Sequence, residues 1–142
     1  MYTILMAIDG DREPARYAAE AVAKYPGDPD EKEVTLLNVQ REFETPDEGE
    51  RVRSEDLYDE SEFPPGIDAA AEILEKAGIP TTKRREHGDP ASTVLEVAEA
   101  IGADAIVLGS RNRSPAGKAL FGSVTQSVIL DTELPVTVIS RD

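Results

Sequence analysis

The residues best suited to bind a ligand lie at positions 104–123, where a strand-like stretch is followed by a basic loop with glycines at both ends. The apolar run at 105–108 has the length and branched side chains of a buried strand. It stops at Gly109, and the loop ends at Gly122 and Ser123, where a helical pattern begins. Backbone N–H groups at a helix start bind anions, and glycine allows a close approach. This order predicts a cradle for a nucleotide phosphate.

Two common phosphate-binding motifs do not fit this region. A P-loop reads Gly-x4-Gly-Lys-[Ser/Thr], whereas this chain has Asn112, then Gly117, Lys118 and Ala119, so the first glycine and the magnesium-binding hydroxyl are missing. A dinucleotide-binding turn needs several glycines after the first strand, where the chain has Gly10 alone. By spacing alone, a surface loop with glycine turns remains an alternative to an anion site.

The polar side chains of this region also have two interpretations. Arg111, Arg113 and Lys118 can pair with phosphates or balance nearby carboxylates. Ser123 and Gln126 fit a capping box, in which the serine accepts a hydrogen bond from a backbone N–H of the first turn. Capping and phosphate contact can coexist, because neighbouring backbone N–H groups also point towards the ligand.

Composition narrows the class of protein. The chain has 142 residues, no cysteine and a formal net charge of −14 at pH 7. We expect one domain, 1–142, with no disulfide and no metal site, since a single histidine without cysteine gives zinc little support.

The negative charge argues against a nucleic-acid partner. The absence of cysteine fits a reducing cytoplasm, where we expect the protein to be located. No stretch reaches the length of a membrane span, so we expect no membrane partner. Acidic residues spread along the whole chain favour a high-salt cytoplasm over an ordinary acidic protein.

Strand and helix patterns alternate along the chain. Strands are predicted at 2–8, 34–39, 105–108 and 136–139, with a weaker basic edge strand at 81–87. Three apolar helix faces are predicted, formed by Ala15, Ala18, Ala19 and Val22, by Ile67, Ala70, Ala71 and Leu74, and by Val94, Val97, Ala98 and Ile101. Asp89, Pro90 and Gly102 mark the ends of the third helix. This alternation predicts an α/β fold, a three-layer sandwich with a five-stranded, mostly parallel sheet and helices on both faces.

One stretch interrupts this rhythm. Residues 42–63 are strongly acidic, contain Pro46 and Gly49, and show no sustained apolar period. We expect a long, mobile, solvated insertion between the second strand and the second helix. A lid or a partner-binding segment is the alternative.

The predicted sheet would gather the candidate residues at one end. In such folds the ligand lies beyond the carboxyl ends of the strands, where the winding direction reverses. If the first and fourth strands are neighbours, this end brings together Asp9, Val39 and residues 109–123. A carboxylate, a strand-end backbone and an anion loop suit the ribose, base and phosphates of a nucleotide. Asp9 has an alternative role as a helix cap, although Asp11 is available for that. No nucleophile–base pair stands out, so we do not expect fast catalysis.

These features together resemble the universal stress protein family over nearly the whole chain. The resemblance rests on the segments 4–10, 36–39, 88–90, 104–110 and 122–129. The family's nucleotide motif is Gly-x2-Gly-x9-Gly-[Ser/Thr], which Gly109, Gly122 and Ser123 match, with Asn112 in place of the second glycine. The resemblance implies a sheet of strand order 3-2-1-4-5, homodimers, and an ATP pocket in one branch of the family. It points to a regulatory, stress-response module that binds ATP or a related adenine nucleotide, with Mg²⁺ on the phosphates.

The resemblance also implies roles for individual residues. Asp9 would contact the ribose or base and the Val39 backbone the adenine, while Gly109, Gly122 and Ser123 would contact the phosphates. The expected site also includes Arg111, Asn112 and Val124. Asparagine tolerates a positive φ, so the turn can survive, but its side chain occupies space that glycine leaves to a phosphate.

Two further expectations concern assembly. We expect the homodimer to form through the edge strand 135–140, because an exposed apolar edge strand is a surface that proteins cover or pair. Asn112 favours the alternative function, a dimeric interaction protein of the same fold that binds no nucleotide.

Overall fold

A parallel sheet runs through the centre of the computed structural model, which describes residues 1–8, 12–40, 63–110 and 123–140. Its strands are β1 (Tyr2–Ala7), β2 (Lys32–Gln40), β3 (Thr81–His87), β4 (Ala105–Ser110) and β5 (Val136–Ser140). They are ordered β3-β2-β1-β4-β5, and every neighbouring pair is parallel. The five predicted strands and the implied order 3-2-1-4-5 are therefore confirmed.

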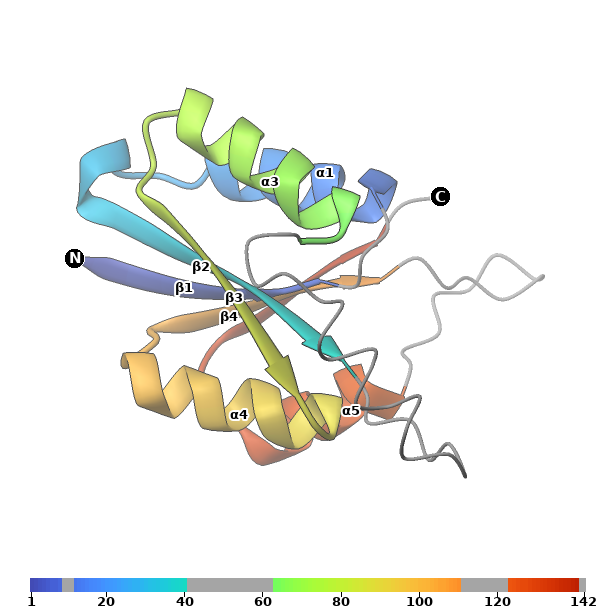
Figure 1. Cartoon of the computed structure of the whole chain (residues 1–142). Helices are drawn as coiled ribbons and strands as arrows, with labels where there is room; N and C mark the ends of the chain where they lie inside the picture. The colour runs from blue at the N-terminus through green and yellow to red at the C-terminus, as the bar shows by residue number, and fades with distance from the viewer. Residues whose placement is uncertain (9–11, 41–62, 111–122, 141–142) are drawn as a thin grey trace.

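Helices cover both faces of this sheet. They are α1 (Arg12–Ala23), α3 (Pro65–Lys76), α4 (Pro90–Ile101) and α5 (Ser123–Asp131), with a 3-10 turn η1 (Pro29–Glu31) before β2. Figure 1 shows α1 and α3 together on one face, and α4 and α5 on the other. The predicted α/β fold with three layers is confirmed.

Each face of the sheet has its own apolar core, because side chains alternate along a strand. Ile4 and Met6 of β1 contribute to the core under α1 and α3, whereas Leu5 contributes to the core under α4 and α5. All three are fully buried. The α1 face consists mostly of alanines such as Ala15 and Ala18, which are also fully buried, and their short side chains let α1 lie close to the sheet.

The predicted ends of α4 are confirmed in detail. The Asp89 side chain accepts a hydrogen bond from the Ser92 backbone N–H at 3.0 Å, which satisfies one of the free donors of the first turn. At the other end Gly102 has a φ of 66°, the left-handed conformation in which glycine commonly stops a helix.

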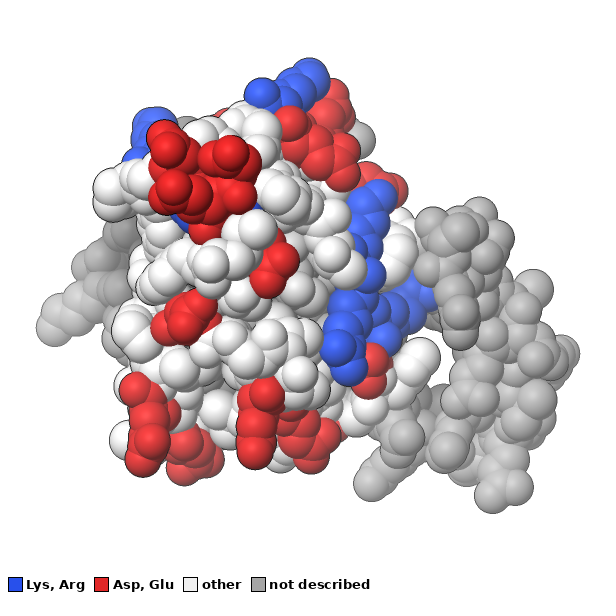
Figure 2. All heavy atoms as spheres, turned by 90° about the vertical axis from the view of Figure 1, so that its left-hand side faces the viewer, with Lys and Arg blue, Asp and Glu red and all other residues white. Residues whose placement is uncertain are grey.

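The basic strand β3 lies at one edge of the sheet, as predicted. Its lysine and arginines include Lys83, which pairs with Asp68 at 2.8 Å, and Arg84, whose Nε lies 3.2 Å from Glu86. Figure 2 shows the molecule from the end at which the strands begin, with acidic side chains spread over the surface and a group of basic ones at one side. Charged side chains on an edge strand discourage pairing with other chains.

The opposite edge of the sheet is formed by β5. Val136 packs against the core under α4 and α5, and Ile139 packs against the core under α1 and α3. The pleat of a strand directs side chains above and below the sheet rather than sideways, so these residues belong to the two cores.

Several predictions fall on residues outside the described ranges. They are residues 42–62 of the expected insertion 42–63, and the site residues Asp9, Arg111, Asn112 and Gly122.

Candidate functional site

The pairing of β1 with β4 creates the end of the sheet at which the candidate residues were expected to meet. Ala7 of β1 has Leu108 of β4 on one side and Leu37 of β2 on the other. The carboxyl ends of β1, β2 and β4 are therefore neighbours. The chain winds from β1 towards β3 on one side and continues from β4 to β5 on the other, so β1 and β4 flank the point where the winding reverses.

Gly109 lies at this end, against the first turns of α1. A Cβ atom built on Gly109 would lie 3.7 Å from Ile8 Cγ2, 3.8 Å from the Pro14 carbonyl oxygen and 4.0 Å from Ala18 Cβ. These are ordinary van der Waals distances, and Gly109 does not belong to the described glycines with positive φ. Neither packing nor backbone conformation therefore requires glycine at position 109. The close approach of a ligand to the backbone would be a reason for glycine there.

The end of β2 supplies the expected strand-end backbone at Val39 and a buried amide at Asn38. Asn38 is 4% exposed; its Nδ2 donates to the Ile8 carbonyl oxygen at 3.4 Å, and its Oδ1 accepts from Gln40 Nε2 at 2.9 Å. The Ile8 N–H in turn donates to the Leu37 carbonyl at 3.1 Å. The Asn38 side chain thus links β2 to the residue that follows β1, directly before Asp9 in the sequence.

Asn38 was not predicted as a site-shaping residue. The signal was available, since it is an uncharged polar residue between Leu37 and Val39 in an otherwise apolar strand. A buried amide that is hydrogen-bonded on both of its atoms fixes local geometry more sharply than an apolar side chain of similar size.

The start of α5 carries no charge that would repel an anion. Ser123 is the first residue of the helix and is exposed, and the first turn carries no acidic side chain. Figure 1 shows α5 beginning at the end of the sheet where β2 finishes. The side chain of Val124 packs against the core under α4 and α5, so the group that Val124 can offer a ligand is its backbone N–H.

The turn before α4 borders the same end of the sheet. The Gly88 N–H donates to the Gln40 carbonyl oxygen at 3.0 Å, and Gly88 has a φ of 141°. His87, at the end of β3, is exposed beside Gln40. Within the described ranges, no group of three or more histidine, cysteine or acidic residues could hold a metal ion.

The structure therefore brings together part of the expected site. Val39, Gly109, Ser123 and Val124 lie on elements that end or begin at the same side of the sheet. The remaining expected residues, Asp9, Arg111, Asn112 and Gly122, belong to the segments that the structure does not describe. Among the helices that are described, none has the length and apolar character needed to cross a bilayer.

Comparison with known sequences agrees with this arrangement. The sequence profile of the universal stress protein family matches residues 1–140. Stress response protein NhaX of Bacillus subtilis is 40% identical over 53 residues, which are 37% of this chain and 32% of that protein. Universal stress protein MJ0577 of Methanocaldococcus jannaschii is 37% identical over 68 residues, 48% of this chain and 42% of that protein. The chain spans a third to less than half of the length of these curated relatives.

Solved structures extend the likeness to the whole fold. The structure of MJ0577 aligns with a TM-score of 0.77 and 28% identity, covering 100% of this chain and 98% of that one. A universal stress protein from Archaeoglobus fulgidus, solved in complex with dAMP, aligns with a TM-score of 0.65 and 19% identity over 97% of both chains. At that identity the second likeness shows the fold alone.

The buried amide at the end of β2 generates a prediction about stability. Asn38→Leu should lower the free energy of unfolding by about 1–3 kcal/mol, because the change leaves the Gln40 amide without its acceptor and the Ile8 carbonyl without this donor. Gln40→Ala, which removes the outer partner, should cost less than half as much. Urea unfolding measures both. An Asn38→Leu protein as stable as the native chain would show that the amide does not fasten β1 to β2.

Proposed function

Because this chain belongs to the universal stress protein family, we propose that it binds an adenine nucleotide at the carboxyl ends of β1, β2 and β4. The nucleotide we propose is ATP. We further propose that the protein is a regulatory module of the stress response in a high-salt cytoplasm, with at most slow ATP hydrolysis. The observation that carries the proposal is the adjacency of β1 and β4, which places the reversal of the winding at the carboxyl ends of these strands, where such folds bind their ligands.

The described residues suggest how each part of the nucleotide would be held. The Val39 backbone lies at a strand end, where it can meet the edge of a base. Gly109 presents a backbone without a side chain, and the exposed N-terminus of α5 offers N–H groups and the positive end of its dipole to phosphates. The proposed contacts of Asp9, Arg111, Asn112 and Gly122 complete the site.

The proposed magnesium ion would depend on the nucleotide. The described residues contain no cluster of acidic side chains able to hold a cation by themselves. Mg²⁺ often binds through substrate phosphates with few protein ligands, so the ion would arrive with the nucleotide and neutralise its charge. Such neutralisation matters in a chain with a net charge of −14, which would otherwise repel a polyphosphate.

A structural neighbour supports this proposal. The Archaeoglobus fulgidus protein holds dAMP on the same fold, which indicates that an adenine nucleotide can be accommodated there. The alternative, an interaction protein without a nucleotide, keeps its support from Asn112. The binding experiment described next separates these two functions.

The first test of the proposal is nucleotide binding. We expect ATP to bind the native protein, and Gly122→Leu to abolish binding without unfolding the chain, because a side chain there would block the approach of the phosphates. Calorimetry with ATP, ADP and AMP, at high and low potassium chloride, measures this. The matched control is Ala100→Leu, at an exposed position of α4, which should bind normally. No binding by the native protein, or equal binding by the Gly122→Leu protein, would remove the proposed site.

The second test concerns the departure from the family motif. If the Asn112 side chain takes space from a phosphate, Asn112→Gly should bind ATP about tenfold more tightly, a difference of about 1.4 kcal/mol. We expect this gain in affinity even though glycine loses more conformational entropy than asparagine when the loop is ordered. The same calorimetric titration measures the change. Unchanged or weaker binding would show that asparagine fits the pocket or contributes a contact.

We also propose that the protein forms a homodimer through β5. The strand pairs with β4 on one side, and the Ile106 N–H donates to the Pro135 carbonyl at 2.9 Å. Successive residues of a strand direct their backbone groups to opposite sides, so Val136 and Val138 present theirs to the open edge. Pairing with a second copy would satisfy these groups, and a two-fold arrangement is the commonest closed one.

The dimer can be tested by light scattering in molar salt. We expect a mass near twice 15.4 kDa for the native protein and near 15.4 kDa for Val138→Lys. Val138 is half-buried, so the lysine also perturbs the core. Val138→Pro is therefore a second variant, which removes an outward N–H while keeping an apolar side chain. A native monomer, or two variants that stay folded and dimeric, would exclude β5 as the interface.

A further inference from the structure

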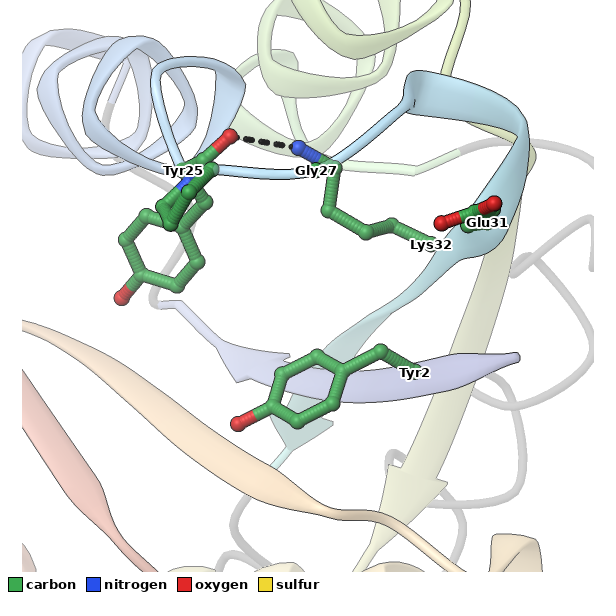
Figure 3. Close-up of a pocket in the computed structure, with 6 residues that line it drawn as sticks. Tyr2, Tyr25, Gly27, Glu31 and Lys32 are labelled. Carbon is green, nitrogen blue, oxygen red and sulfur yellow. Dashed lines mark hydrogen bonds between the residues drawn. The ribbon is translucent and has the colours of Figure 1, made fainter.

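A cavity lies far from the proposed nucleotide site, at the end of the sheet where β1 and β2 begin. Its volume is about 350 Å³, within the usual range of small-molecule pockets. It is lined by Tyr2, Tyr25, Pro26, Gly27, Glu31 and Lys32. Figure 3 shows the two tyrosine rings on the same side of the extended Lys32 side chain. No part of the proposed function uses this cavity.

The chain segment between α1 and β2 builds this cavity. Tyr25 follows the end of α1, and its N–H donates to the Val22 carbonyl at 3.0 Å. Gly27 has a φ of 103°, which favours glycine and turns the chain towards η1. The register of the sheet then sets Tyr2 of β1 beside Lys32, the first residue of β2. Two aromatic rings from different elements are thereby held at one opening.

Lys32 is the unusual member of this group. The residue is 4% exposed, and its Nζ donates to the Tyr25 carbonyl oxygen at 2.7 Å. An ammonium group has further N–H donors, and burying one is costly unless an opposite charge lies near. Among the residues that the structure describes, no carboxylate lies within 4.0 Å of this Nζ to form an ion pair. The buried cation therefore has a carbonyl partner but no charged one there.

From this cavity, its aromatic walls and its buried cation, we propose a binding site for a small aromatic carboxylate. The aromatic ring would lie against Tyr2 and Tyr25, and the carboxylate would accept hydrogen bonds from Lys32 Nζ and supply its counter-charge. Tyr2 is 43% exposed, a large exposure for an aromatic ring, and a bound ring would cover it. An organic cation is disfavoured, because Lys32 already places a positive charge in the wall.

Glu31 gives the proposal a distinctive signature. Its side chain lines the cavity, is exposed, and lies at the end of the Lys32 side chain away from Tyr25 (Figure 3). It would repel a carboxylate ligand across the rim. The affinity for a carboxylate ligand should therefore rise when Glu31 is neutralised. It should also rise with the salt concentration until salt has screened the repulsion from Glu31. A site built for a cation would show the opposite response in both experiments.

A purely structural role for Lys32 is the competing explanation. The bond from Lys32 Nζ to the Tyr25 carbonyl joins the start of β2 to the segment after α1, and this tie would exist without any ligand. Such a role would affect the stability of the chain but would create no preference between charged and neutral ligands. Binding selectivity therefore separates the two explanations.

The experiment uses three probes that share a phenylethyl group, on the full chain. They are 3-phenylpropionate, its neutral amide 3-phenylpropanamide, and the cation 2-phenylethylamine, each followed by the amide NMR signals around Tyr25 and Lys32. We expect 3-phenylpropionate to bind, the amide to bind at least tenfold more weakly, and the amine to cause no shifts. Equal binding of the acid and the amide, binding of the amine, or no binding of the acid would overturn the proposal.

Variants of the lining residues sharpen the result. Lys32→Met keeps an unbranched apolar side chain without the ammonium group and should reduce binding of 3-phenylpropionate at least tenfold. Glu31→Gln should raise it about twofold, whereas Glu99→Gln, an exposed acid on α4, should leave it unchanged. Should Lys32→Met fail to fold, Tyr2→Ala provides an independent test at an exposed position, and it should weaken binding severalfold while Tyr2→Phe retains it. Undiminished binding by the Tyr2→Ala and folded Lys32→Met proteins would contradict the assignment.

Discussion

The parallel pairing of β1 with β4 is the contact on which the rest of this structure depends. It begins where Asp104 meets Thr3: the Asp104 N–H donates to the Thr3 carbonyl at 2.7 Å, and the Asp104 carboxylate accepts from the Thr3 N–H at 2.9 Å. From there the register continues from Ile4 and Ala105 to Ala7 and Leu108. This junction reverses the winding of the chain, so α1 and α3 cover one face while α4 and α5 cover the other. The nucleotide site that we propose lies at this reversal.

The two ends of the sheet present different chemical groups because different chain segments lie over them. At the carboxyl end, strand ends meet helix starts, and exposed backbone N–H groups suit an anion. At the other end, the connection from α1 to β2 folds over the first residues of β1 and β2 and encloses an aromatic cavity with a buried lysine. The ligand proposed for each end is an anion, and in a strongly acidic chain the groups proposed to hold it act locally, against the net charge.

Local sequence signals predicted the parts of the fold that depend on neighbouring residues. Helix caps such as Asp89 and Gly102 and the buried alanine face of α1 depend on spacing within a few residues. The strand order was available through the family resemblance, since periodicity states which residues are buried but not which strands pair. Lysine is usually a surface residue, so the sequence alone does not predict that Lys32 is buried. Its burial depends on its register with Tyr2, which is a contact between segments far apart in sequence. For the same reason the hydrogen bond between Asn38 and Ile8 could not be predicted from spacing.

The central claim is that an adenine nucleotide occupies the crevice beyond β1, β2 and β4. Amide chemical-shift mapping during an ATP titration tests it most directly, because it locates the ligand on the folded chain. The account predicts shifts at Val39, Gly109, Ser123 and Val124, with Tyr2 and Lys32 at the other end of the sheet unaffected. Shifts confined to the end with Tyr2 and Lys32, or no shifts at all, would contradict it.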